Sequence, residues 1–444
     1  MVYSGPCSQI PRLPDNGRYW LKKGRVPLCL LADPAPDLVA RADRDGLVHA
    51  DIRVEEGRVR AVVPAGTAPC CGPGLHLDGG MVWPCPVDLH THLDKAHLWP
   101  RAENPDGTFD SALATVRADA VLWNADDLEA RMDFAVRAAY AHGTRAIRTH
   151  LDSGGGQAGI SWGVFRRLRQ RWAGRIELQA AALATPDVWL TGEGEALADR
   201  VAEVGGVYGG ITFPHPALKT ALVRAFTLAA ERGLDLDFHV DESLSPDVHG
   251  LRLVAETAIA TGFQGRTVCG HACALAVQSD SEVEATLAVV KEAGMTVVSL
   301  PMCNLYLQDR GAGRTPRRRG VTLMHEMRAA GIPIAVASDN VRDPFHGYGD
   351  LDMVETYTQA VRIAHLDRPH GDWPPCATTV PAMAMKLAWD GRISSGCPAD
   401  LVLFRARFYS ELLSRPQADR MVLRDGRLVD TRLPDYRELD GPLG

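Results

Sequence analysis

The chain has 444 residues, of which 46% are hydrophobic and 23% charged, a balance typical of a folded globular protein. Its formal net charge is −7, and the basic residues are dispersed apart from Arg314–Gly320 (RTPRRRG), which is more simply a solvated loop. This pattern argues against a nucleic-acid or membrane partner. The first residues do not resemble a signal peptide and no apolar stretch reaches about 18 residues, so we expect a cytoplasmic protein.

The sequence pattern at both ends of the chain predicts short β-strands. Residues 19–80 contain strand-like runs separated by Pro and Gly, with a hairpin turn at Gly57. Residues 395–435 repeat this style, and Asp425-Gly426 is a strong hairpin signal. We therefore predict one small sheet domain built from both termini around a different middle.

Residues 81–394 alternate strand-like runs with helical patterns that close on glycine. The eight strand-like runs begin near residues 81, 144, 176, 207, 234, 266, 295 and 332. Eight strands, each followed by a helix, predict an α/β fold with a (β/α)₈ TIM barrel rather than an open doubly wound sheet. No GxGxxG fingerprint follows the first strand, and the three glycines of residues 154–156 predict a flexible loop.

Polar residues end five of the predicted strands. They are His90 and His92 on the first, His150 and Asp152 on the second, His239 and Glu242 on the fifth, His271 on the sixth, and Asp339 and Asn340 on the eighth. Taken singly, each histidine is more simply a satisfied polar or core residue. In a parallel barrel, however, the carboxyl ends of the strands meet at one mouth. Imidazole and carboxylate are good ligands for zinc or ferrous iron, so we predict a metal site formed by His90, His92, His239 and Asp339.

Four motifs carry a family resemblance: HTHLD from His90, HVDE from His239, GHACA from Gly270 and ASDN from Ala337. With these motifs the chain resembles the amidohydrolase superfamily, specifically its cytosine deaminase branch, over most of its length. The resemblance implies a TIM barrel flanked by a β-sandwich from both termini, and the ligand set named above. Binuclear relatives bridge two ions with a lysine at the end of strand four, which this chain lacks, so a single Zn²⁺ or Fe²⁺ is implied.

The resemblance also implies roles for the other polar residues. Glu242 would carry a proton to a ring nitrogen, and His271 would hold or polarise the attacking hydroxide. A divalent ion lowers the pKa of bound water towards about 7, and Asp339 can accept the water proton before ammonia leaves. The structural alternative for Glu242 is a solvated loop carboxylate. We therefore predict a hydrolytic deaminase of a small, amino-substituted nitrogen heterocycle.

Three positions depart from the cytosine deaminase pattern. Thr185, Asn340 and Phe345 stand where the branch has a glutamine, a second aspartate and a tryptophan. Losing an amide, a carboxylate and an indole changes the polar pairing and the volume of a buried pocket together. A ring other than cytosine is therefore favoured.

Further residues near the mouth are candidate substrate contacts. Lys95 and Arg101 follow the first strand, as in a subgroup that deaminates pterins bearing a carboxylate, although an ordinary charged loop explains them equally well. His150 and Asp152 would support the metal ligands or contact substrate. Gln308, in the stretch after strand seven, would line the ring pocket or cap the structure.

Two alternatives remain open at this stage. A cyclic amide hydrolase or an N-alkylamine hydrolase would use the same metal and acid. The first would release no ammonia, and the second would release an amine. A non-catalytic metal-binding scaffold is the alternative of a different class, although it would have no need of Glu242 or His271. The sequence leaves a homo-oligomer open as well.

Overall fold

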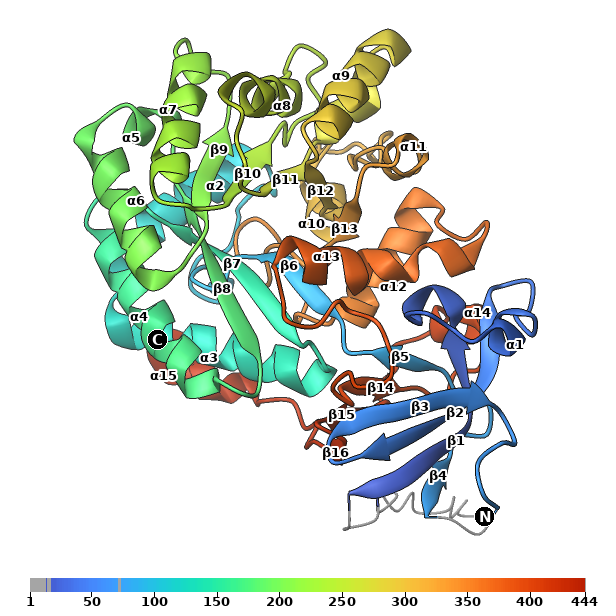
Figure 1. Ribbon diagram of the computed structural model, residues 1–444. Helices are drawn as coiled ribbons and strands as arrows, with labels where there is room; N and C mark the ends of the chain where they lie inside the picture. Colours follow the sequence, from blue (N-terminus) through green and yellow to red (C-terminus); the bar gives the residue numbers. More distant parts are fainter. Residues whose placement is uncertain (1–12, 14–16, 71–72, 444) are drawn as a thin grey trace. The chain divides into compact units, whose positions relative to one another are not determined.

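The computed structural model describes residues 13, 17–70 and 73–443, and the chain forms two compact units (Figure 1). The smaller unit combines the N-terminal part up to residue 85 with residues 369–374 and 392–431, and the larger unit contains residues 86–368, 375–391 and those from 432 on. In the described part of the chain, no helix has both the length and the apolar character needed to cross a membrane.

Both ends of the chain contribute strands to the smaller unit. One sheet has the order β3-β2-β1-β4 and the other β16-β15-β14-β5. Their bounds are β1 (Arg18–Pro27), β2 (Leu47–Glu55), β3 (Arg58–Pro64), β4 (Gly74–His76), β5 (Val82–Pro84), β14 (Leu401–Leu403), β15 (Met421–Arg424) and β16 (Arg427–Leu428), with the short helices α1 (Pro36–Val39) and α14 (Tyr409–Leu412). Glu56-Gly57 and Asp425-Gly426 adopt positive φ angles between paired strands, so both hairpin predictions are confirmed.

The larger unit is built on parallel strands, which form sheets of order β6-β7-β8 and β13-β12-β11-β10-β9. Their bounds are β6 (Val87–Thr91), β7 (Ala146–Asp152), β8 (Glu177–Leu183), β9 (Tyr208–Thr212), β10 (Leu236–Val240), β11 (Thr267–His271), β12 (Thr296–Ser299) and β13 (Ile334–Val336). A parallel bridge between Ala181 and Val207 joins β8 to β9, and one between Thr91 and Asp339 joins β6 to the end of β13. The two bridges close a ring of eight strands, which is the predicted (β/α)₈ barrel.

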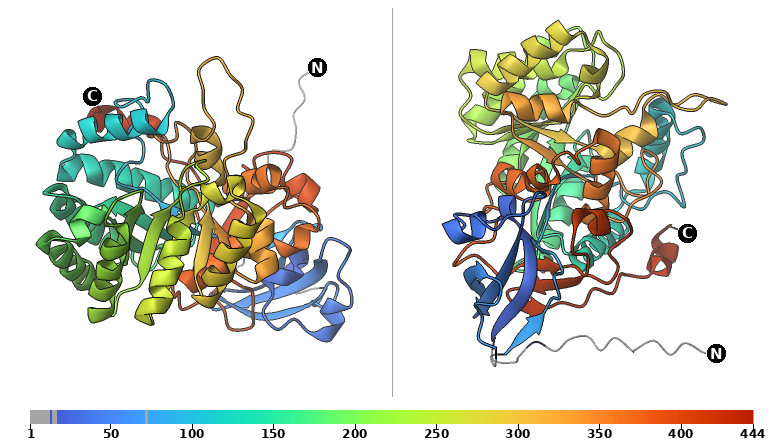
Figure 2. Two further views of the ribbon diagram at one scale, coloured as in Figure 1. Left: turned by 90° about the horizontal axis from the view of Figure 1, so that it is seen from above. Right: turned by 90° about the vertical axis from the view of Figure 1, so that its right-hand side faces the viewer.

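Helices such as α3, α4, α6 and α7 lie on the outer side of these strands (Figures 1 and 2), whereas α2 lines the cavity described below. Their bounds are α2 (Phe109–Asp119), α3 (Ala125–His142), α4 (Gln157–Trp172), α5 (Pro186–Trp189), α6 (Gly192–Val204), α7 (Leu218–Glu231), α8 (Gly250–Thr261), α9 (Asp280–Glu292), α10 (Pro301–Leu307), α11 (Met324–Ala330), α12 (Met353–Ala364), α13 (Thr379–Ala384) and α15 (Asp440–Leu443). Local sequence sets several of their ends: Asn124 accepts two backbone N–H bonds at the start of α3, and Gly143 ends that helix in the left-handed conformation.

Strand β9 passes very close to its neighbours, and its glycines permit this. A Cβ atom on Gly210 would lie 2.0 Å from the carbonyl oxygen of Ala184 and 2.7 Å from the Trp189 ring. A Cβ on Gly209 would lie 1.8 Å from the carbonyl oxygen of Asp237. Backbone atoms cannot move aside as a flexible side chain does, so the double glycine is required by the closed barrel.

We predict that Gly210→Val costs about 3 kcal/mol of unfolding free energy or more, because the new side chain overlaps backbone. The measurement is chemical denaturation followed by circular dichroism. The matched control is Gly159→Ala in α4, where a Cβ has open space, and it should stay within about 1 kcal/mol of the wild type. Equal stability of the two variants would contradict the packing argument.

Candidate metal centre

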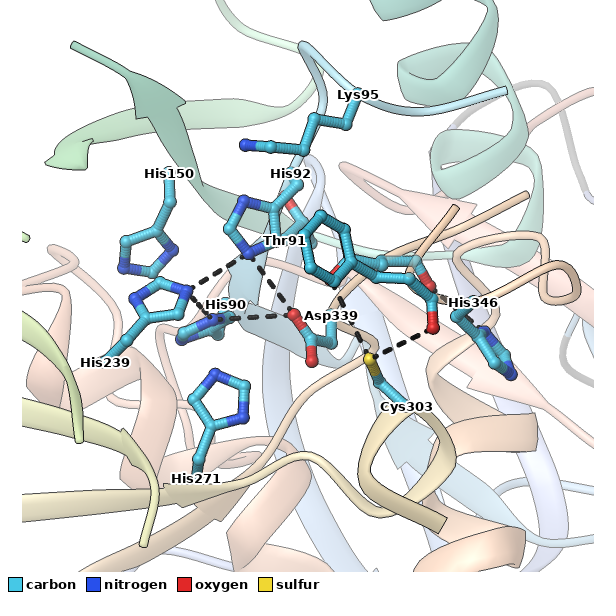
Figure 3. A network of polar contacts seen from close by, with 12 residues as sticks. His90, Thr91, His92, Lys95, His150, His239, His271, Cys303, Asp339 and His346 are labelled. Carbon is cyan, nitrogen blue, oxygen red and sulfur yellow. Dashed lines mark hydrogen bonds and ion pairs between the residues drawn. The ribbon is translucent and has the colours of Figure 1, made fainter. Parts of the chain in front are cut away.

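Donor atoms from three strand ends converge at the mouth of the barrel (Figure 3). The Nε2 atom of His239 lies 3.1 Å from that of His90 and 3.2 Å from that of His92. Asp339 Oδ1 lies 3.6 Å from His90 Nε2 and 3.3 Å from His92 Nε2. The side chains of all four residues are almost completely buried. The structure therefore brings together the four ligands predicted from the sequence.

The protonation of these groups fits a cation. Burial, with the neighbouring histidines or Lys95, holds the pKa of His90, His92 and His239 well below its usual value, so the rings are neutral.

Burial raises the pKa of Asp339 to about 8, although the neighbouring Cys303 thiol opposes this shift. Donors on a tetrahedron around zinc are about 3.3 Å apart, since Zn–N distances are about 2.0–2.1 Å. The separations of 3.1 to 3.6 Å match that spacing.

His150 packs against the ligand rings from the end of β7. Its ring centroid is 4.0 Å from that of His90, and it offers a nitrogen within 4.8 Å of the three ligand histidines. Its Nε2 lies 3.3 Å from Asp237 Oδ1, and Asp237 Oδ2 accepts a hydrogen bond from Arg148 at 2.8 Å. Arg148 and Asp237 stand two residues before His150 and His239, so a buried polar layer supports the histidines.

Glu242 and His271 lie together beside this cluster. His271 Nδ1 is 3.4 Å from Glu242 Oε1, and the Asn304 amide nitrogen contacts both, at 3.0 Å from His271 and 3.4 Å from Glu242. Burial, followed by the charge of Asp339, raises the pKa of Glu242 well above its usual value. Burial lowers the pKa of His271 to about 3, so a proton in this group resides on the carboxyl.

Asn304 was not assigned individually from the sequence. It belongs to the stretch after strand seven that was predicted to line the pocket or cap the structure, and no motif marks its amide as a link between two strand ends. Gln308, four residues on, donates from Nε2 to the backbone carbonyl of Glu242 at 3.2 Å. Helix α10 and the turn that follows it therefore hold Glu242 at two points.

A cavity of about 530 Å³ opens on the cluster. The predicted site residues that line it are His92, Lys95, Asp152, Thr185, His239, Glu242, His271, Asn340 and Phe345. Phe109, Leu113 and Val116 of α2 add an apolar wall that the sequence analysis did not anticipate. The cavity thus offers ionisable groups at one end and apolar surface at the other.

Lys95 and Asp152 form an ion pair in the cavity wall. Lys95 Nζ is 2.5 Å from Asp152 Oδ1 and 3.8 Å from Asp94 Oδ1. The lysine side chain is 5% exposed and that of Asp152 is 34% exposed, so the carboxylate reaches the cavity. Burial opposes the charge of Lys95, but the two aspartates outweigh burial and raise its pKa. The lysine stays charged and has N–H donors beyond the one given to Asp152.

Arg101 takes a different place from the one predicted. Its guanidinium donates to Asp119 at 2.8 Å and to Asp127 at 2.9 Å, and Arg101 is not among the residues that line the cavity. Two carboxylates neutralise it, which leaves no charge for a substrate. The exposed Arg117 of α2 lines the cavity instead.

The two changed residues after strand eight both face the cavity. Asn340 donates its amide to Asp343 Oδ2 at 2.7 Å, so its N–H group is already engaged by the protein. Phe345 packs edge-on against Phe109 at 5.5 Å between ring centroids. This side of the cavity is therefore apolar or internally satisfied.

Comparison with known proteins identifies the family of this chain. A sequence profile of the amidohydrolase family matches residues 190–430. The chain belongs to the amidohydrolase family, and the resemblance seen in its motifs is confirmed.

Individual proteins within and around this family are similar to the chain to different degrees. A pterin deaminase of Rhizobium rhizogenes is 48% identical over 97% of this chain and 98% of its own length. An N-isopropylammelide isopropyl amidohydrolase of Pseudomonas sp. is 25% identical over 80% of this chain and 87% of its own length. The solved 5-methylcytosine deaminase of Klebsiella pneumoniae with phosphonocytosine has a TM-score of 0.79 at 21% identity, covering 95% of this chain and 99% of its own. At that identity the structural match supports the fold.

We predict that His239→Ala lowers bound transition metal from about one ion per chain to well below one, since three donors remain and the ion binds them more weakly. The measurement is metal analysis of purified protein after dialysis. His215→Ala is the control, because His215 pairs with Asp187 outside the cluster and should leave the metal content unchanged. Full metal content in His239→Ala would contradict the assigned ligand set.

Proposed function

We propose that this protein is a metal-dependent hydrolytic deaminase whose substrate is a pterin-type ring, with the amino group at an amidine carbon. The observation that carries the proposal is the placement of Glu242, a carboxyl with a raised pKa, beside the three-histidine and aspartate cluster at the floor of a substrate-sized cavity. The 48% identity to a pterin deaminase supports the same reading.

The shape of the cavity favours a bicyclic ring over a pyrimidine. Its volume of about 530 Å³ falls in the range of small-molecule sites. Thr185 replaces a longer amide, and the apolar wall that includes Phe109 and Phe345 offers aromatic side chains against which the second ring can pack.

A divalent cation bound by His90, His92, His239 and Asp339 would act as a Lewis acid and lower the pKa of water to about 7. We assign either Zn²⁺ or Fe²⁺, because both accept nitrogen and oxygen donors. Asp339 accepts the proton of the attacking water. Glu242 holds a proton and delivers it to the ring nitrogen next to the carbon under attack. Asp339 then passes the water proton to the amino nitrogen, the C–N bond breaks with loss of ammonia, and the remaining hydroxyl proton restores Glu242. Neutral His271, held by Asn304, directs its free Nε2 towards the reacting oxygen.

The ion pair in the wall suits the remaining edge of the substrate. A pterin presents a ring carbonyl next to a ring N–H, which require a donor and an acceptor side by side. Lys95 supplies the donor, and the exposed part of Asp152 supplies the acceptor. The substrate is then oriented with its amino-bearing carbon at the metal.

A second candidate is the release of an alkylamine from a ring. The same cation and the same acid would serve it, and the apolar α2 wall could hold an alkyl group. The 25% identity to the isopropyl amidohydrolase supports this alternative. A cytoplasmic location and a homo-oligomer also remain proposals.

A release assay separates the candidates. Zn- and Fe-loaded protein is incubated with pterin, cytosine, isocytosine, guanine and amino-triazines, and ammonia is measured, while N-isopropylammelide is followed by isopropylamine release. We expect ammonia from pterin at the highest kcat/KM. Amine release without ammonia release would transfer the assignment to the second candidate.

We predict that Glu242→Gln lowers kcat for pterin by about 10²- to 10⁴-fold, because the amide cannot carry the proton. Metal content should stay near that of the wild type, since Glu242 is not one of the four proposed ligands. Glu256→Gln, an exposed glutamate of α8 paired with Arg252, is the control and should retain full activity. Full activity of Glu242→Gln would remove the proton-carrier role.

We predict that Lys95→Met lowers kcat/KM for pterin by about 10- to 100-fold, because a charged donor to the ring carbonyl is lost and Asp152 is left without its partner. Lys386→Met is the matched control, because it makes the same substitution at a lysine outside the cavity. Lys386 pairs with Asp235 at 2.7 Å outside the cavity, so its loss should change the constant little.

A further inference from the structure

A second group of donor atoms shares Asp339 with the histidine cluster and adds Cys303 and Glu242 to it. Cys303 Sγ, a carboxylate oxygen of Glu242 and a carboxylate oxygen of Asp339 all lie within 4.8 Å of one another. In the view of Figure 3, Asp339 lies between Cys303 and the ligand histidines. Cys303 is fully buried on α10, and its thiol has no part in the proposed deamination.

We propose that Glu242, Cys303 and Asp339 form a second, weaker binding site for a soft divalent cation such as Zn²⁺ or Cd²⁺, and that filling this site inhibits the enzyme. Thiolate and carboxylate together suit zinc and cadmium, and the thiol releases one proton on binding. Asp339 has two carboxylate oxygens, of which Oδ1 faces the histidine nitrogens at 3.6 and 3.3 Å. One carboxylate can therefore serve both cations.

The affinity of this second site is limited by its own composition. It offers three protein donors, one of them shared with the first cation, and two like charges come close together when both sites are filled. The first site has four protein donors, three of which belong to it alone. We therefore expect the second cation to bind at least about 100-fold more weakly, which separates the two steps in a titration.

A cation can reach the second site through the cavity. Glu242 lines the cavity and its side chain is 16% exposed, while the thiol of the buried Cys303 lies within 4.8 Å of its carboxylate. The substrate cavity is therefore the route of entry, and bound substrate should oppose binding of the second ion.

The inhibition rests on the proposed function, because it acts through Glu242. A carboxylate bound to a cation cannot hold the proton that the ring nitrogen needs. When more than one equivalent of metal is present, the second cation would thus bind the Glu242 carboxylate, which could then no longer act as the acid.

The test is a Cd²⁺ titration of metal-free protein, followed by calorimetry and by the ultraviolet absorption of cadmium–thiolate bonds. We expect two binding steps, with the thiolate absorption arising in the second step alone. Cys303→Ser and Cys303→Ala should keep the first step, which also shows that they are folded, and lose the second step and the absorption. Cys269→Ser, at another fully buried thiol on β11 outside the group, should keep both steps.

A single binding step in the wild type, or an unchanged second step and absorption in both Cys303 variants, would overturn the site. Inhibition is tested separately, with pterin and rising free Zn²⁺. The rate of each protein is divided by its own rate at one equivalent of Zn²⁺. The free Zn²⁺ concentration needed for inhibition should be at least about 10-fold higher for Cys303→Ser than for the wild type. Equal inhibition would remove the inhibitory role. Absence of pterin deamination in the wild type would refute the proposed function while the cadmium titration still decides the site.

Discussion

The arrangement on which this structure depends is the approach of three neutral imidazole nitrogens and one carboxylate in a dry barrel mouth. Lone pairs at 3.1 to 3.6 Å repel one another unless a proton or a cation lies among them. Burial keeps the rings of His90, His92 and His239 neutral, so a cation bound among these nitrogens and the Asp339 carboxylate would stabilise the cluster. The same burial raises the pKa of Glu242 and thereby supplies an acid next to the cation site.

Different parts of the surrounding structure hold the histidines and the acid Glu242 in place. The polar layer of Arg148 and Asp237 lies one pleat below the ligands and fixes His150 against His90. Helix α10 holds the other side, where Asn304 contacts both Glu242 and His271. The rigid strands therefore position the metal ligands, while a helix after β12 positions the acid. That same helix places a thiol next to Asp339, which gives the site its sensitivity to a second soft cation.

Sequence reasoning succeeded where geometry is fixed by the strand itself. Alternation places His90 and His92 on one face, and parallel strands bring His239 and Asp339 to the same mouth. Arg101 could not be placed in this way, because it lies in a loop whose path is not fixed by any period. Its partners are Asp119 at the end of α2 and Asp127 in the first turn of α3, and their pairing with Arg101 exists only after the chain has packed.

By itself, the sequence determined the eight strand–helix repeats, the hairpins of the terminal sheets and the family, and it indicated the candidate metal ligands. These features follow from local period, turn residues and motif spacing, which act over a few neighbouring residues. The tertiary structure alone decided that Asn304 joins Glu242 to His271, that Phe109 walls the cavity, and that Cys303 borders Asp339. Such contacts join residues tens to hundreds of positions apart, and only closure of the barrel brings them within a few ångströms.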